Sequence, residues 1–296
     1  MTARILITGA TGMVGKEVLR KFAAVGVAVR AAVHKSDHFS TEFHASRTIE
    51  PVSFDFTDQQ MIDNALKDVD MVLMITPSVS DLSEYVRIFL HRAKHSHISH
   101  IVKISNFGTG MAPMIKLSGW HHEAELLLQE SGINHTIVRV NSLMQYFFSC
   151  MQPMGGLLDL PLGRGAVSFI DARDVAVALL EIFTCSLKHS NKVYNLTGPQ
   201  MVSLFKATSI ISEVIGQHVE YVDISEETAR HVMESTGMPA WRIDLYLELY
   251  AFYRAGLASN VTDHYQHITG AAPKTLADFA KDHEKTLRAI VEHEEQ

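Results

Sequence analysis

The feature that most constrains this chain is a short apolar segment followed by a turn rich in glycine. Residues 5–7 are Ile-Leu-Ile, and Gly9, Gly12 and Gly15 follow at intervals of three. Apolar residues then recur at helical spacing, which predicts a strand, a glycine turn and a helix. The free N–H groups and the helix dipole at the end of such a turn attract an anion. Glycine lets the backbone turn tightly there and approach a phosphate closely.

The spacing G-x-x-G-x-x-G differs from the commoner dinucleotide pattern G-x-G-x-x-G. Glycine turns between a strand and a helix also occur for packing alone. This turn, however, follows a strand of buried character and opens a βαβ pattern that the apolar residues 26–33 complete. We therefore predict that it holds the pyrophosphate of a dinucleotide.

Further apolar segments alternate with helical patterns along the chain. The expected strands are residues 5–7, 26–33, 51–54, 70–75, 100–105, 133–140 and 193–196. The expected helices between them include residues 58–66, which Thr57 or Asp58 could cap, and residues 82–93 and 117–131. This alternation predicts an α/β fold, a Rossmann-like doubly wound parallel sheet rather than an antiparallel one.

The composition changes beyond residue 199, where helical patterns predominate. Ser203 is expected to cap a helix that ends at Gly216, Asp223 has capping-box spacing to Glu226, and Pro239 is expected to begin a long aromatic helix. We expect residues 1–199 to form the NAD(P)-binding domain and residues 200–296 a smaller, mostly helical substrate or partner domain. Residues 145–165 are expected to join it across the crevice.

Charge and composition exclude several classes of function. A net charge of −7 gives no broad basic surface, so nonspecific binding of nucleic acid is disfavoured. Two cysteines cannot build a disulfide framework, and no apolar stretch approaches the length of a membrane span. His91 and His95 lie one helical turn apart without a supporting Cys or carboxylate, so no metal site is expected. The expected protein is soluble and cytoplasmic, without a membrane partner.

The end of the second strand indicates which cofactor is bound. An NAD site usually places Asp or Glu there to bind the ribose 2′-OH, whereas this chain has His34 and Lys35. Both side chains would attract a 2′-phosphate, so NADP(H) is favoured over NAD(H). The alternative is a solvated loop whose charges have no such role. Thr76 and Pro77 end the fourth strand, where a ligand crevice would open.

Two aromatic segments are candidates for an apolar pocket. Residues 143–148 could line one, and Tyr246, Leu249, Tyr250 and Tyr253 share one helical face. Tyr146 and Tyr250 are therefore our candidate substrate-binding residues. Packing in an ordinary core is the alternative for both segments.

Taken together, the motifs resemble the NmrA-like branch of the atypical short-chain dehydrogenases and reductases. The segments that carry the resemblance are Thr8-Gly-Ala-Thr-Gly-Met-Val-Gly15, Phe54-Asp-Phe-Thr-Asp58, Val102-Lys-Ile-Ser105, His121-x-x-x-Glu125, Ile170-Asp-Ala-Arg-Asp174, Leu196-Thr-Gly-Pro199, Val261-Thr-Asp263, Ile268-Thr-Gly270 and Thr275-Leu-Ala-Asp-Phe279. They cover nearly the whole chain. The family contains NADPH-dependent quinone, azo-dye and triphenylmethane-dye reductases, and also regulators that bind the cofactor without evident turnover.

The resemblance also implies which residues contact the cofactor. It places the pyrophosphate on Thr11, Gly12, Met13 and Val14, the 2′-phosphate near His34 and Lys35, the adenine beside Asp55 and Phe56, the ribose near Thr76 and Pro77, and the nicotinamide against Asn141, Ser142, Leu143 and Met144. Three positions depart from the family pattern. His34 stands where relatives usually have Arg, and Val140 and Tyr146 stand where they often have Pro and Asn.

The mechanism is limited by a missing motif, because no tyrosine in the chain has a lysine four residues later. The usual Tyr-x-x-x-Lys proton donor is therefore absent. The mechanism that remains possible is hydride transfer to an acceptor that needs little proton assistance. Orientation of that acceptor against the nicotinamide would supply much of the catalysis. His121 is the best candidate proton donor or substrate positioner, because an unperturbed imidazole titrates near neutral pH. The alternative is a histidine satisfied by Glu125 on the helix surface.

Our first hypothesis is an NADPH-dependent reductase of a quinone-like or conjugated electrophilic acceptor. The second is a non-catalytic regulator that senses NADP(H), and the third is a reductase of a natural-product imine or enone. The expected partner is a small-molecule electron acceptor. The sequence leaves two further partners open as alternatives, a second copy of the chain in a homodimer and a regulatory protein.

Overall fold

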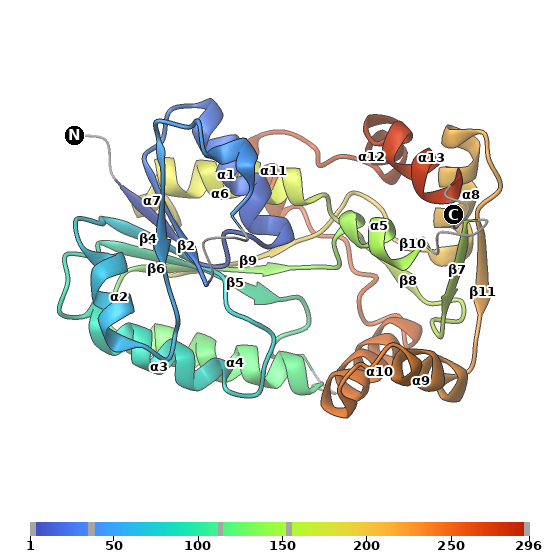
Figure 1. Ribbon diagram of the computed structural model, residues 1–296, viewed down its shortest axis with the longest axis horizontal. Helices are drawn as coiled ribbons and strands as arrows, with labels where there is room; N and C mark the ends of the chain where they lie inside the picture. The colour runs from blue at the N-terminus through green and yellow to red at the C-terminus, as the bar shows by residue number, and fades with distance from the viewer. Residues whose placement is uncertain (1–3, 35–38, 112–114, 152–155, 293–296) are drawn as a thin grey trace. The chain divides into compact units, whose positions relative to one another are not determined.

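The computed structural model describes residues 4–34, 39–111, 115–151 and 156–292. The chain divides into two compact units, and each is assembled from separate stretches of sequence (Figure 1). The first comprises Met1–Val140, Ala172–Leu196 and His267–Gly270, and the second comprises Asn141–Asp171, Thr197–Gln266 and Ala271–Gln296. The domain boundary after residue 199 that the sequence suggested stays a prediction.

The first unit is built on a parallel sheet of seven strands in the order β3-β2-β1-β4-β5-β6-β9. Each adjacent pair of strands runs parallel. The strands are β1 (Ile5–Ile7), β2 (Val29–Val33), β3 (Ile49–Ser53), β4 (Met71–Met74), β5 (His100–Asn106), β6 (His135–Val140) and β9 (Lys192–Leu196). Central strands such as β1 and β4 are buried throughout, as their unbroken apolar sequences indicate. Pro51 lies in the edge strand β3, where a missing N–H is tolerated.

Helices cover both faces of this sheet (Figure 1). Helices α1 (Met13–Ala24) and α6 (Ala172–Thr184) pack together on one face, and the short α7 (Ser186–His189) follows α6. The opposite face carries α2 (Gln59–Leu66), α3 (Leu82–Ala93) and α4 (Lys116–Glu130). The expected Rossmann-like, doubly wound parallel fold is confirmed.

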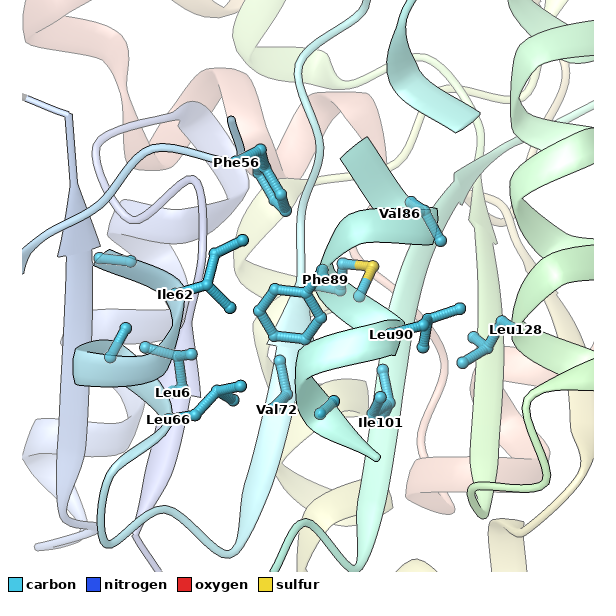
Figure 2. Packing of buried hydrophobic residues seen from close by; sticks show 14 of the residues in the cluster. Leu6, Phe56, Ile62, Leu66, Val72, Val86, Phe89, Leu90, Ile101 and Leu128 are labelled. Atoms are coloured by element: carbon cyan, nitrogen blue, oxygen red, sulfur yellow. The ribbon is translucent and has the colours of Figure 1, made fainter. Parts of the chain in front are cut away.

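The core beneath α2, α3 and α4 holds these elements in register. Figure 2 shows the ring of Phe89 from α3 among side chains of α2 and of strands β1, β4 and β5. Phe54 and Phe56 meet edge-to-face at 4.8 Å between ring centroids, and both lie within about 6.3 Å of Phe89. Burying each such ring contributes about 1.5–3 kcal/mol. This packing fixes the carboxyl ends of the strands, where the site residues lie.

The second unit contains two short pairs of strands and several helices. Its strands are β7 (Leu157–Leu160) parallel to β11 (Glu220–Asp223), and β8 (Ala166–Val167) antiparallel to β10 (Val202–Ser203). Its helices are α5 (Phe147–Cys150), α8 (Leu204–Ile215), α9 (Glu226–Ser235), α10 (Ala240–Arg254), α12 (Leu276–Asp282) and α13 (Glu284–Glu292). Residues of α11 (His264–Thr269) fall in both units.

Helix termini show which local signals were correctly interpreted. The Asp58 side chain caps α2, and Ser203 caps α8, which ends at Gly216 with a φ of 66°. The expected capping box at Asp223 is wrong, because Ser225 caps α9 instead. Asp223 ends strand β11, where its carboxylate accepts hydrogen bonds from the Gly163 N–H and the Tyr221 hydroxyl.

Within the described part of the chain, none of the helices combines the length and the apolar character needed to cross a membrane.

Candidate functional site

The sheet has a topological switch point between β1 and β4. These strands are neighbours, but the helices that follow them, α1 and α3, cover opposite faces. Ligands of doubly wound sheets bind where neighbouring connections diverge in this way. Thr8 joins the two strand ends, since its hydroxyl donates to the Ile75 carbonyl at 2.9 Å and accepts from the Ile75 N–H at 2.8 Å. The glycine turn and Thr76 are thereby brought to one edge.

The three glycines of the turn serve different purposes. Gly9 has a φ of 61°, and its carbonyl accepts the Gly12 N–H at 3.0 Å. A Cβ on Gly15 would lie 2.2 Å from the Gly9 carbonyl oxygen, so this glycine is required by packing. A Cβ on Gly12 would lie 3.3 Å from the same oxygen, and Gly12 is exposed. Gly12 is therefore the position where backbone is open to a ligand.

The N-terminus of α1 is suited to an anion. Gly12 is its N-cap residue and supplies no side-chain cap, and the first turn has no acidic residue. The first N–H groups of a helix have no partner within it, so those of Met13, Val14 and Gly15 face the turn. Thr11 is half-buried and Met13 exposed, whereas Val14 is buried. Because Gly12 provides no side-chain cap, the N–H groups at this end of α1 can bind a pyrophosphate.

Thr76 supplies an independent indication of a polar ligand. Its Oγ1 atom is buried and has no hydrogen-bond partner among the described residues. A buried hydroxyl without a partner costs about 1–3 kcal/mol, which a ligand hydroxyl would offset. Pro77 beside it is exposed. Together with the glycine turn, this orphaned hydroxyl fits the phosphate and ribose of a dinucleotide.

The residues expected to contact the adenosine differ in their exposure to solvent. His34 is exposed, and its Nδ1 lies 3.5 Å from Asp55 Oδ2, whereas Lys35 lies outside the described residues. Hydrogen bonds from Thr57, and to a smaller extent the charge of His34, hold the pKa of Asp55 below its usual value. A carboxylate therefore stands beside the histidine expected to bind a 2′-phosphate. Phe56 is 8% exposed within the core, so its contact with adenine stays a prediction.

His121 does not have the environment that the sequence suggested. It is 7% exposed, and its Nδ1 lies 3.1 Å from Nζ of Lys103, a fully buried residue of β5. Burial, and then the neighbouring Lys103, lower the pKa of His121 well below its ordinary value. The assumption of an unperturbed imidazole is therefore wrong. So is the alternative pairing with Glu125 at the helix surface, because Glu125 is buried and has other partners.

Glu125 forms the centre of a buried polar network. Arg139 donates to it through Nε at 3.0 Å and through Nη2 at 2.6 Å, and the Ser105 hydroxyl donates to it at 2.5 Å. Lys103 also donates to the Ile104 carbonyl at 3.0 Å. Burial lowers the pKa of Lys103 to about 8, although the charge of Glu125 opposes this shift. Sequence reasoning missed Lys103, whose signal was a lysine inside an otherwise apolar strand.

The residues expected at the nicotinamide belong to the second unit and follow β6 directly. Asn141 is buried, and its amide donates to the Ser168 hydroxyl at 2.7 Å and the Ala258 carbonyl at 2.9 Å. Leu143 and Met144 are also buried, and only Ser142 is partly exposed. The contacts that the resemblance assigns to this segment stay a prediction.

The expected substrate residues form an aromatic cluster in the second unit. Tyr146 is 44% exposed, and the rings of Tyr246 and Tyr250 on α10 stack with centroids 6.2 Å apart. Burial, followed by Cys150 and the neighbouring tyrosines, raises the pKa of Tyr250. The raised pKa keeps the Tyr250 phenol neutral at physiological pH, so its ring offers a flat surface with a polar edge.

Comparison with known proteins gives relatives along nearly the whole chain. The NAD(P)H azoreductase of Xenophilus azovorans is 32% identical over 281 residues, which cover 94% of this chain and 97% of the relative. The structure of the NADPH-dependent quinone oxidoreductase of Escherichia coli with NADPH has a TM-score of 0.81 at 23% identity, covering 94% of this chain and 99% of that one. For the Citrobacter sp. triphenylmethane reductase with NADP(H), the TM-score is 0.80 at 22% identity, with 94% and 99% coverage.

The two solved structures support the fold. The azoreductase is similar in sequence over the same share of this chain. In addition, the model of the NmrA-like family matches residues 1–258. This chain belongs to the NmrA-like family.

Proposed function

We propose that this chain is an NADPH-dependent reductase that transfers hydride to a quinone-like or conjugated electrophilic acceptor. The observation that carries the proposal is the open backbone at Gly12, at the N-terminus of α1 and at the switch point of the sheet. The orphaned hydroxyl of Thr76 at the same edge supports it. The relatives named as reductases and oxidoreductases support a nicotinamide-dependent oxidoreductase as the general class.

In this proposal the N–H groups that begin α1 hold the pyrophosphate, and Thr76 bonds a ribose hydroxyl. His34 and Lys35 bind the 2′-phosphate, which gives the preference for NADPH. Asp55 opposes that preference, because its carboxylate lies 3.5 Å from His34. When bound, the cofactor supplies a hydride, that is, two electrons and one hydrogen nucleus.

The proposed acceptor is one whose reduction needs little proton donation by the protein. Reduction of a quinone by hydride consumes one further proton, whereas a cationic dye needs none at its central carbon. The absence of a Tyr-x-x-x-Lys pair from the sequence favours such acceptors over simple ketones. Tyr146 and Tyr250 offer phenol faces on which a planar acceptor can stack.

The test is steady-state oxidation of NADPH and NADH against a panel of quinones, azo dyes and triphenylmethane dyes. We expect turnover with at least one of these acceptors and a higher kcat/KM with NADPH. The Gly12→Asp variant is the matched control, because it places a carboxylate where the phosphate should lie. Cofactor binding without turnover of any acceptor would support the sensing regulator instead. Turnover confined to imines or enones would support the natural-product reductase.

A further inference from the structure

The buried pair of Lys103 and His121 defines the hydrogen-bonding state of the imidazole. An ammonium group has three donors and no acceptor. Since Nζ lies 3.1 Å from Nδ1 of His121, Nδ1 must accept the hydrogen bond. A neutral imidazole that accepts at Nδ1 carries its proton on Nε2. The geometry therefore selects one of the two neutral tautomers.

The second ring nitrogen of His121, Nε2, is the one that carries the proton in this tautomer. Among the described residues, the buried nitrogen and oxygen atoms that lack a partner do not include an atom of His121. Nδ1 is satisfied by Lys103, which leaves Nε2–H as the ring group that can donate to a ligand, and 7% of the residue stays exposed. The hydrogen bond between Lys103 and Nδ1 therefore fixes the orientation of a ring whose Nε2–H can donate.

We propose that Lys103 is a positioning residue, which fixes His121 as a neutral Nε2–H donor toward the acceptor oxygen. This inference rests on the proposed function. His121 donates a hydrogen bond to the carbonyl oxygen that gains negative charge as hydride arrives, and it keeps its own proton. The proton that completes the hydroquinone comes from water. Such a donor stabilises the developing charge without titrating in the working pH range.

The surrounding charges favour this state. Glu125 on α4 is neutralised by its two bonds to Arg139 on β6, and Ser105 on β5 donates to it as well. The positive charge of Lys103 is therefore the charge that acts most directly on His121. It disfavours a second proton on the imidazole, in agreement with the lowered pKa of His121.

The test combines NMR of 15N-labelled histidine with kinetics, on the full chain. Lys103→Met keeps the length of the side chain but removes its donors, whereas Lys103→Gln keeps an N–H donor without the charge. We expect wild type and Lys103→Gln to show His121 as the Nε2–H tautomer without titration from pH 5.5 to 7.5. Lys103→Met should lose this tautomer preference. Circular dichroism checks that all variants are folded.

The kinetic arm uses a quinone and a cationic dye. His121→Ala should lower kcat for the quinone by about 100-fold, Lys103→Met by a smaller factor and Lys103→Gln least, with NADPH affinity unchanged. The kcat for the dye should fall little in these variants, because the central carbon of the dye accepts hydride without such a donor. Titration of wild-type His121 near pH 6.5, or an unchanged tautomer in Lys103→Met, would overturn the inference. If wild type turned over no acceptor, the proposed function would fail, while the NMR arm would still decide the role of Lys103.

Discussion

Acid should destabilise the first unit through histidines buried at the amino-terminal end of its sheet. His100 begins β5, is 2% exposed, and bonds through Nε2 to the Thr136 hydroxyl at 2.9 Å. Thr136 in turn donates to the carbonyl of His189, whose ring bonds the Tyr194 hydroxyl. Thr136 has thus used its own proton, so His100 must donate from Nε2. The charged and titratable groups around these two rings are His135, Glu181, Lys188 and Lys192.

The size of the effect follows from the pKa of His100, which burial and the neighbouring histidines lower from 6.5 to about 4. The unfolded chain then binds a proton at a higher pH than the folded chain, so stability falls as the pH drops from 6.5 toward 4. Between pH 7 and pH 5 this single group should cost at most about 2 kcal/mol. The pKa of His189 is lowered as well, also first by burial, and adds to the loss in the same direction.

The measurement is urea unfolding at pH 7 and pH 5 for wild type and His100→Gln. The glutamine amide can still donate to Thr136 but does not titrate. The variant should therefore lose about 2 kcal/mol less than wild type between the two pH values. His91→Gln, which changes an exposed histidine, is the control and should behave as wild type. An equal loss in His100→Gln and wild type, at equal m-values, would refute the argument.

Three further predictions concern the glycine turn and the cofactor site. Gly12→Asp should abolish NADPH binding in calorimetry while the protein stays folded, whereas Gly15→Ala should lose stability by about 1–3 kcal/mol in thermal unfolding, because its Cβ would meet the Gly9 carbonyl. Unchanged NADPH affinity in folded Gly12→Asp would remove the pyrophosphate from this turn. Changing His34 and Lys35 together to Ala should weaken NADPH by about 1–3 kcal/mol and leave NADH almost unaffected. Equal losses for the two cofactors would show that these residues do not recognise the 2′-phosphate.

Much of the fold could be predicted because its signals are local. Unbroken apolar strands, the Asp58 cap and the glycine that ends α8 are all properties of neighbouring residues. The parallel direction of the strands follows from the alternation of strands and helices, since parallel strands need a crossover connection between them. The capping box at Asp223 failed because its spacing was right while strand β11 already included that residue.

The candidate site was less accessible to sequence reasoning, because its partners lie far apart along the chain. Glu125 and His121 share a helix face, which suggested that they pair. In the structure β5 brings Lys103 to His121, while Ser105 of β5 and Arg139 of β6 bind Glu125. Spacing along one helix cannot reveal partners on two strands. A lysine in an apolar strand was nevertheless a visible signal that the sequence analysis did not use, since a buried charge needs a compensating partner.

That lysine is costly to the fold. Burial lowers the pKa of Lys103 from 10.5 to about 8, which corresponds to about 3 kcal/mol of lost stability near neutral pH. The cost is present below pH 8 and is relieved as the pH rises from 8 to 10.5, because the folded chain then releases its proton first. A methionine would fill the same space without this cost, so Lys103→Met should raise the free energy of unfolding at pH 7. Higher stability together with slower quinone reduction would show that Lys103 is retained for its action on His121. Lower stability would show instead that its hydrogen bonds outweigh the cost of burying the charge.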